Sequence, residues 1–260
     1  MGTGAITGYV DVAQLVLYAF WAFFFGLIYY LQRESKREGF PLESDLPNGQ
    51  TVITHGLIGM PTPKVFRLAH GGEVTVPNDI KSPQQLRAEP RHGWIGAPLV
   101  PTGNPMLDGV GPGAYADRAD VPDMTPEGDP KIVPLRSAPD YAVSEKDPDP
   151  RGMEVIGGDG ELAGTVKDLW IDKSEMLFRF LEVEVAGSGG KTVLVPINFA
   201  RIRGGRINQV KVRSILAGQF AQVPGIKNPE QVTLLEEEKI MAYFGGGTLY
   251  ADPGRQEPLV

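Results

Sequence analysis

Five carboxylates lie close together in the second half of the chain and are the side chains best suited to chemistry. They are Asp168, Asp172, Glu175, Glu182 and Glu184, which lie within 17 residues. Two cations, Lys173 and Arg179, lie among them. Carboxylates whose pKa values are raised near a partner surface can exchange protons at neutral pH. Asp172 and Glu175 fall between two expected strands, where a rigid scaffold often presents functional groups. A solvated structural face is the alternative, because Glu182 and Glu184 alternate with apolar residues as a polar strand face does.

The rest of the composition excludes most other chemistry. The chain of 260 residues has no cysteine and only three histidines, His55, His70 and His92, without a paired-histidine metal motif. It also lacks the Gly-x-Ser-x-Gly motif of hydrolases and the phosphate-binding Gly-x-x-x-x-Gly-Lys motif. A net charge of −7 offers no broad basic surface for nucleic acid. We therefore expect a protein that is not an enzyme and that itself binds no metal or nucleic acid.

One segment is long enough to cross a membrane. Residues 12–32 carry no charge, and a helix of this length spans about 30 Å of hydrocarbon. No basic residue precedes it, as a cleaved signal peptide would require, so we expect an uncleaved transmembrane helix. Three cations follow at once, Arg33, Lys36 and Arg37. The positive-inside rule then places residues 33–260 in the cytoplasm and residues 1–11 in the periplasm.

One face of this predicted helix is suited to contact with another membrane protein. Leu15, Ala19, Ala22 and Gly26 recur every three or four residues and form a stripe of mostly small side chains. Small residues let transmembrane helices approach closely. A chance arrangement in an alanine-containing span is the alternative.

The segment after the helix is rich in turns. Residues 33–150 hold 18 of the 23 prolines, so long helices cannot form there, and short strands are predicted at residues 64–68 and 73–76. Apolar residues recur along it, namely Leu57, Ile58, Met60, Trp94, Ile95, Leu99 and Val100. Disorder is the alternative for such a composition, and we expect an extended segment that becomes ordered against a partner.

Residues 151–245 have the alternation of a small β-barrel followed by a short helix. Strands are expected at residues 153–156, 164–172, 178–185, 191–196 and 206–212, between glycine-rich turns. Residues 229–244 have helical spacing, and the three glycines at 245–247 are expected to end that helix before a C-terminal tail, residues 246–260. The predicted fold is one N-terminal transmembrane α-helix plus a mainly β cytoplasmic domain with a short C-terminal helix.

Four segments in this order resemble the H subunit of the purple-bacterial photosynthetic reaction centre. They are YAFWAFFFGLIYYLQRESKREGFPLE, TGNPMLDGVGP, AGTVKDLWIDKSEMLFRFLEVEV and QVTLLEEEKIMAYFGGGTLYA. The resemblance covers nearly the whole chain, and residues 151–245 also resemble the PRC-barrel module. It implies a subunit without pigment that stabilises the L and M subunits, shields the quinone side and assists proton transfer to the secondary quinone.

The same resemblance implies the partners and the location. The L and M subunits would hold bacteriochlorophyll, bacteriopheophytin, quinones and non-haem iron, and this chain would bind none of them directly. Membrane lipids, an antenna complex and a cytochrome subunit are further expected partners. The location would be the bacterial inner, intracytoplasmic membrane.

The resemblance also implies a proton relay made of particular residues. The inner relay carboxylate of the family falls at Glu175, with Asp172 close to the same path and Arg179 at a matching basic position.

The surface that accepts protons in the family falls on residues 123–131, where this sequence departs from the pattern. Paired histidines are replaced by Glu127 and Asp129, and an aspartate is replaced by Thr125. We expect Asp123, Glu127 and Asp129 to take up protons in their place. Carboxylates have a lower ordinary pKa than imidazole, so the pH dependence should differ and inhibition by zinc should be weaker.

Two other functions fit parts of the sequence. A single-pass membrane-tethered PRC-barrel adaptor for another membrane complex would share the fold but would not purify with pigmented subunits. A tethered hydrolase that uses Asp172 and Glu175 as an acid and base would need a substrate pocket, which the sequence does not reveal.

Overall fold

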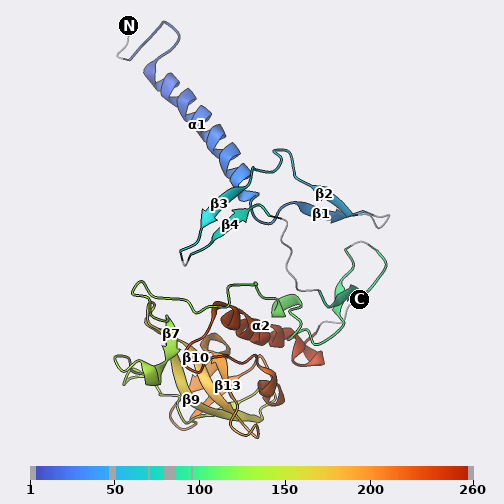
Figure 1. Cartoon of the computed structure of the whole chain (residues 1–260), viewed down its shortest axis with the longest axis vertical. Coiled ribbons are helices and arrows are strands. Elements are labelled where there is room, and N and C mark those ends of the chain that lie inside the picture. Colours follow the sequence, from blue (N-terminus) through green and yellow to red (C-terminus); the bar gives the residue numbers. More distant parts are fainter. Residues whose placement is uncertain (1–3, 47–50, 70, 79–85, 95, 257–260) are drawn as a thin grey trace. The chain divides into compact units, whose positions relative to one another are not determined.

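The computed structural model describes residues 4–46, 51–69, 71–78, 86–94 and 96–256 (Figure 1). Two residues used in the sequence arguments, His70 and Ile95, lie outside the described residues. The chain divides into two compact units, Met1–Pro83 with Gly93–Gly96, and Gln84–His92 with Ala97–Val260.

The first unit begins with the long helix α1, Val12–Ser35. Asp11 caps it, because its side chain accepts a hydrogen bond from the Gln14 amide at 2.7 Å while the Gln14 side chain accepts one from the Asp11 amide at 3.4 Å. The helix is long and apolar enough to cross a membrane, and its apolar span is not buried within the chain. The predicted helix is confirmed, and it continues past Gln32 to Ser35.

Two hairpins follow α1 in the first unit. They are β1 (Leu42–Asp45) with β2 (Thr51–Thr54), and β3 (Lys64–Arg67) with β4 (Glu73–Val76), so the two strands predicted here are confirmed. Cations that follow the helix hold these segments. Arg37 is buried and donates to the Val76 carbonyl oxygen at 3.0 Å, and Lys36 donates to the His55 carbonyl oxygen at 2.7 Å. Two of the residues expected to orient the anchor therefore also order the chain beyond it.

The second unit is built on a seven-stranded sheet and a small separate hairpin of β5 (Ala88–Pro90) and β6 (Leu99–Pro101). The sheet strands are β7 (Ile132–Pro134), β8 (Glu154–Ile156), β9 (Leu162–Asp172), β10 (Leu177–Val185), β11 (Thr192–Pro196), β12 (Ala200–Arg203) and β13 (Gln209–Val212). Their order is β11-β10-β9-β8-β13-β12, with β7 beside β9, and only β8 and β13 are parallel. All five strands predicted for this domain are present, whereas β7 and β12 were not predicted.

The core of this unit lies between the sheet and helix α2, Leu234–Tyr250. Trp170 and Phe180 from the sheet and Tyr243 and Phe244 from α2 are among its largest fully buried side chains. The Phe244 ring lies edge-on to Phe220, with centroids 6.2 Å apart. Burying several aromatic rings supplies much of the stabilisation of a domain of this size. The predicted mainly β domain with a C-terminal helix is confirmed.

The start of α2 differs from the prediction. The helix begins at Leu234 rather than at residue 229, because Thr233 and Glu236 form a capping box. The Glu236 amide donates to the Thr233 hydroxyl oxygen at 3.1 Å, and the Thr233 amide donates to the Glu236 carboxylate at 2.9 Å. Glu236 is therefore buried at the helix start instead of exposed on its surface.

The end of α2 corrects a second expectation. The helix runs through the three glycines to Tyr250, so the predicted glycine stop is wrong. A Cβ atom on Gly246 would lie 3.1 Å from the Gly113 Cα atom, and one on Gly247 would lie 2.4 Å from Ile215 Cγ2. The glycines allow close packing of the helix against neighbouring segments and do not end it.

Candidate functional site

A cluster of carboxylates surrounds Lys131, which directly precedes β7. The Lys131 Nζ atom lies 3.4 Å from Asp172 Oδ2, 3.7 Å from Asp123 Oδ2 and 3.8 Å from Glu175 Oε1. These three acids are all expected site residues, and they come together around a cation that the sequence did not single out. We refer to these four residues as the Lys131 cluster.

Main-chain hydrogen bonds hold Lys131 between its carboxylates. Ile132 of β7 pairs with Asp172 of β9, and the Lys173 amide donates to the Lys131 carbonyl oxygen at 3.0 Å. On the other side, the Lys131 amide donates to the Asp123 carbonyl oxygen at 2.8 Å. The cation therefore sits where the loop before β7 meets the end of β9.

Asp172 is the interior member of the Lys131 cluster, with a side chain that is only 1% exposed. Its Oδ1 atom accepts hydrogen bonds from the Ser174 and Glu175 amides, both at 3.0 Å. These bonds shape the turn that presents Glu175, whose side chain is 50% exposed. Because an isolated buried charge is very unfavourable, the amides and Lys131 are what allow a carboxylate at this depth.

Lys131 keeps its charge within the cluster. Burial disfavours the charged form, but the charge and hydrogen bond of Asp172, followed by the charges of Asp123 and Glu175, raise its pKa above the ordinary value. A permanent cation at neutral pH reduces the repulsion among three neighbouring carboxylates.

Arg179 links the cluster to a further acid on α2. Its Nη1 atom lies 3.9 Å from Glu175 Oε2, and its Nη2 atom lies 3.8 Å from Glu237 Oε2. Burial raises the pKa of Glu237 to about 7, which the positive charges of Arg179 and Arg118 only partly oppose. Glu237 can therefore exchange a proton near neutral pH, and it is a candidate site residue that the sequence analysis missed.

A signal for Glu237 exists in the sequence. Three successive glutamates occupy residues 236–238, and successive helix positions differ by about 100° around the axis. Three such positions span about 200° of the circumference, so in a helix that packs on a sheet at least one of them lies at the edge of the buried face. The structure buries Glu236 in the cap, leaves the Glu237 side chain 12% exposed and leaves that of Glu238 32% exposed.

The loop before Lys131 holds the remaining acids expected at the site. The Thr125 amide donates to the Asp129 carbonyl oxygen at 2.8 Å, which closes a turn with Glu127 at its exposed tip. The Asp129 carboxylate lies 3.8 Å from Lys173 Nζ and is 69% exposed. No ion pair joins Glu127 to any residue that the structure describes. Asp129 is thus near the Lys131 cluster, whereas Glu127 stands apart from it.

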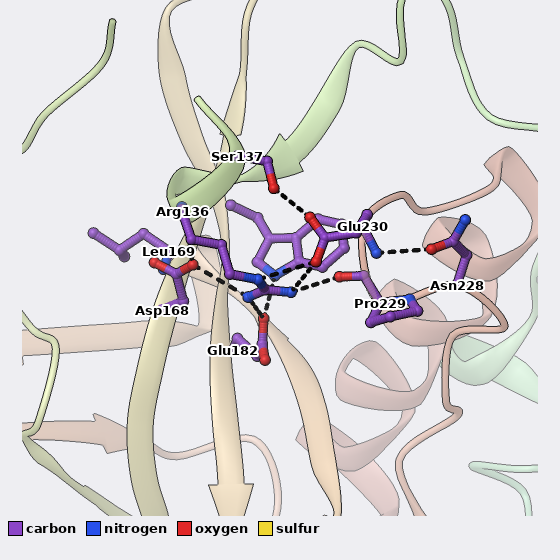
Figure 2. Close-up of polar contacts among 9 residues, drawn as sticks. Arg136, Ser137, Asp168, Leu169, Glu182, Asn228, Pro229 and Glu230 are labelled. Carbon is purple, nitrogen blue, oxygen red and sulfur yellow. Dashed lines mark hydrogen bonds and ion pairs between the residues drawn. The ribbon is translucent and has the colours of Figure 1, made fainter. Parts of the chain in front are cut away.

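Two other acids of the group belong to a separate network around Arg136 (Figure 2). Asp168 and Glu182 are cross-strand partners on β9 and β10. The Arg136 Nη1 atom lies 3.2 Å from Asp168 Oδ2 and 2.7 Å from Glu182 Oε2, and the Trp170 indole donates to the same glutamate oxygen at 2.9 Å. Like charges directly opposite each other destabilise a sheet, and Arg136 offsets this repulsion.

The Arg136 network extends to the segment that precedes α2. Arg136 donates to the Pro229 carbonyl oxygen at 2.6 Å and to the Glu230 carboxylate at 3.1 Å, and the Ser137 hydroxyl also donates to Glu230 (Figure 2). The hydrogen bonds of Ser137 and Arg136 lower the pKa of Glu230. With all its donors directed at protein acceptors, this network joins three segments of the domain and has the features of a structural site.

The expected partner face of α1 is open in the isolated chain. Leu15, Ala19, Ala22 and Gly26 are all exposed, and a Cβ atom added to Gly26 would meet nothing within 4 Å. This face is therefore available to a lipid or to another helix.

Metal binding receives no support from the geometry. Across the parts of the chain that the structure describes, no three His, Asp or Glu side chains are arranged to hold a metal ion.

Two family models match the chain. One, described as photosynthetic reaction centre, H-chain N-terminal region, matches residues 4–137, which is slightly more than half of the chain. The other, described as PRC-barrel domain, matches residues 143–212. The Lys131 cluster draws on both matched regions, with Asp123 and Lys131 from the first and Asp172 and Glu175 from the second.

Proposed function

Because the chain belongs to the photosynthetic reaction centre H-chain family, we propose that the Lys131 cluster carries protons from the cytoplasm toward the secondary quinone. The chain is a membrane-anchored subunit of the reaction centre and contains a PRC-barrel domain. One observation carries the proposal. Three carboxylates lie within 3.4 to 3.8 Å of a single lysine, and they range from half-exposed Glu175 to fully buried Asp172.

Each residue has a distinct part in this relay. Asp123 and Glu175 are partly exposed, so they accept protons from water and pass them inward as neutral carboxylic acids. Asp172 is the inner acceptor, held in one orientation by two backbone amides. Lys131 holds the three acids together and offsets their repulsion. Arg179 stays charged and holds Glu175 and Glu237 on either side of it, and the pKa of about 7 suits Glu237 to proton exchange in the neutral range.

The outer end of the relay uses acids in place of imidazoles. Asp129 is highly exposed and lies beside Lys173, and Glu127 lies at the exposed tip of the same turn. Both accept protons from bulk water. Zinc prefers imidazole and thiolate ligands, so proton uptake by this chain is less sensitive to zinc than uptake through a histidine pair.

The rest of the chain supports the assembly. The open stripe on α1 docks on the L and M subunits, which hold the bacteriochlorophyll, bacteriopheophytin, quinones and non-haem iron. Exposed apolar side chains of the turn-rich segment, such as Leu57, Trp94 and Leu99, become covered by those subunits and by membrane lipids. Residues 1–11 lie in the periplasm, and the PRC-barrel domain shields the quinone side in the cytoplasm.

Single substitutions in the purified reaction centre test the relay. Glu175→Gln and Asp172→Asn remove the exchangeable proton while keeping the shape of the side chain. Each should slow proton-coupled transfer of the second electron to the quinone by about a hundredfold and leave the first charge separation unchanged. Glu184→Gln is the matched control, because Glu184 lies on β10, pairs with Lys167 and is outside the cluster. Unchanged second-electron kinetics in both cluster variants would refute the relay.

The assembly itself is tested by gentle purification from the native membrane in mild detergent. Near-infrared pigment bands that bleach reversibly in light, together with two further membrane subunits, would support the proposed partners. A colourless preparation without them would favour a membrane-tethered adaptor.

A further inference from the structure

The hairpin of β12 and β13 is strongly basic in an acidic chain. Residues 201–213 contain five cations and no acid, although the whole chain carries a net charge of −7. The five cations are Arg201, Arg203, Arg206, Lys211 and Arg213. None of them forms an ion pair with any residue in the described parts of the chain, whereas most other cations of the second unit are paired.

Two of these cations face each other across the hairpin. Arg201 of β12 and Lys211 of β13 are cross-strand partners in an antiparallel pair, so their side chains leave the sheet on the same face. Like charges in this position destabilise a sheet. The carboxylate pair Asp168 and Glu182 in the same sheet has Arg136 between its members. Among the described residues, no carboxylate lies between Arg201 and Lys211 as Arg136 lies between the two acids. An anion from outside the chain would offset the repulsion between these two cations.

A shallow cavity of about 600 Å³ lies beside Lys211, one member of this pair. Its walls include the cations Lys211, Arg213 and Arg255 and the polar residues Asn198, Ser214 and Thr248. No carboxylate is among its described lining residues. Two acids lie close in sequence to the lining residues Gly158 and Arg255, and both already accept hydrogen bonds within the chain. Asp159 accepts one from the Ala217 amide, and Asp252 accepts one from the Gly254 amide. The cavity therefore combines three positive charges with neutral hydrogen-bond donors.

Arg255 is held rigidly at the cavity wall. Its guanidinium donates to the carbonyl oxygens of Ser214 at 2.8 Å, Gly247 at 2.7 Å and Arg213 at 2.9 Å. A Cβ atom on Gly158 would lie 2.8 Å from Arg255 Nη2, so glycine keeps this side of the cavity open. A cation fixed before binding loses little conformational entropy when an anion arrives.

We propose that this cavity binds a phosphate group. Lys211 and Arg213 are its charged ligands, Arg255 supplies a fixed positive charge, and the side-chain amide of Asn198 donates a hydrogen bond. Phosphate fits because it carries up to two negative charges and several acceptor oxygens, which match three cations and a neutral amide donor better than a single carboxylate would. The phosphate comes either from a soluble compound or from the headgroup of an anionic phospholipid.

Titration of the purified complex with inorganic phosphate at low ionic strength tests the site. Binding is followed by isothermal titration calorimetry for the wild type, Lys211→Gln and Lys146→Gln. Lys146 is the matched control, because its exposed side chain lies in the same domain and its loss changes the net charge equally. Lys211→Gln should weaken phosphate binding about tenfold or more, and Lys146→Gln should leave it unchanged. Absence of saturable binding to the wild type, or equal affinities in both variants, would overturn the proposal.

A second variant and a change of lipid complete the test. Arg213→Gln should also weaken phosphate binding about tenfold or more. This second variant keeps the site testable if Lys211→Gln fails to fold. Wild-type phosphate affinity in Arg213→Gln would refute the site. The wild-type and Lys146→Gln complexes are then placed in nanodiscs of phosphatidylcholine, with and without phosphatidylglycerol. Competition by phosphatidylglycerol that lowers phosphate affinity in the wild type and equally in Lys146→Gln assigns the site to a lipid headgroup. Equal phosphate affinity in both nanodiscs assigns it to a soluble phosphate.

Discussion

The Nζ atom of Lys131 lies 3.4 Å from the Oδ2 atom of Asp172, a carboxylate whose side chain is 1% exposed. The lysine is itself only 21% exposed, so neither charge is fully hydrated. A pair of this kind matters for folding, because each charge is tolerated only while the other is present. It also matters for the proposed relay, because the same lysine brings Asp123 and Glu175 to Asp172. Changes at Lys131 should therefore affect stability and proton transfer together.

Lys131→Met should destabilise the subunit by about 2 kcal/mol. The substitution keeps the length of the side chain but leaves Asp172 buried without a cation, and the partial exposure of Lys131 moderates the cost. Urea unfolding of the full-length chain in detergent measures the change. Lys146→Met is the control, because Lys146 is exposed, and it should differ from the wild type by less than about 0.5 kcal/mol. Equal effects of the two substitutions would contradict the assigned role of Lys131.

Glu237→Gln should change the pH dependence of stability. Burial raises the pKa of Glu237 from 4.5 to about 7. Between these two pH values the folded chain holds a proton on Glu237, whereas the unfolded chain has lost it. The contribution of Glu237 to stability is therefore most favourable below pH 4.5 and is lost as the pH rises toward 7. The glutamine variant lacks this decline and should gain up to about 3 kcal/mol relative to the wild type above neutral pH.

Urea unfolding midpoints at pH 5 and pH 8 measure this difference for Glu237→Gln. Glu238→Gln provides the neighbouring control, because the Glu238 side chain is more exposed, at 32%. If the stability of the wild type and that of Glu237→Gln change by the same amount between pH 5 and pH 8, Glu237 takes up no proton on folding.

Arg136→Met should be among the most destabilising single changes on the surface of the domain, at about 3 kcal/mol. It leaves Asp168 and Glu182 facing each other across two strands without a cation. Arg151→Met is the comparison, because Arg151 pairs with Asp149 on the exposed surface and a pair of that kind contributes less than about 1 kcal/mol. Thermal unfolding followed by tryptophan fluorescence reports the change through Trp170, whose indole donates to Glu182. Similar midpoints for the two variants would argue against a structural role of the Arg136 network.

Gly247→Ala should destabilise the domain even though alanine favours helix. The new Cβ atom would lie 2.4 Å from Ile215 Cγ2 and 2.6 Å from the Ser214 carbonyl oxygen, which outweighs a gain in helix propensity of about 1 kcal/mol. The expected net loss in unfolding free energy is about 2 kcal/mol. Gly218→Ala is the control, because a Cβ atom there meets nothing within 4 Å. Stabilisation by Gly247→Ala would show that close packing is not the reason for glycine at this position.

Ala22→Leu should weaken association of the subunit with the reaction centre about fivefold. The larger side chain holds apart two helices that otherwise pack closely, at a cost of about 1 kcal/mol. Ala13→Leu is the matched control, because Ala13 faces about 150° away from the centre of the stripe on α1. The measurement is the fraction of subunit that remains bound through detergent washes. If Ala13→Leu releases the subunit as readily as Ala22→Leu, the stripe is not the docking face.

Much of the fold follows from short-range sequence patterns. The uncharged segment, the alternating strands and the overall class were predictable because each pattern reports the environment of a few neighbouring residues. β7 escaped prediction because it is a short apolar run, buried throughout and ended by Pro134, so it shows no alternation. β12, Ala200–Arg203, does alternate and could have been predicted. The glycines in α2 were misread for another reason. A glycine that permits close packing looks the same in sequence as one that ends a helix, and only Ile215 and Gly113 on the other side of the contact distinguish the two.

The site shows the same division more sharply. The sequence pointed to Asp123, Asp172 and Glu175 and placed Asp172 and Glu175 in one turn, but it did not point to Glu237. It could not separate them from Asp168 and Glu182, because which cation each acid meets depends on residues far away along the chain. The pairing of β7 with β9 brings Lys131 to Asp172, and the packing of α2 against the sheet buries Glu237 and raises its pKa. Charge and residue type are properties of the sequence, whereas burial and the distance between charges, which determine how an acid behaves, arise only when the chain is folded.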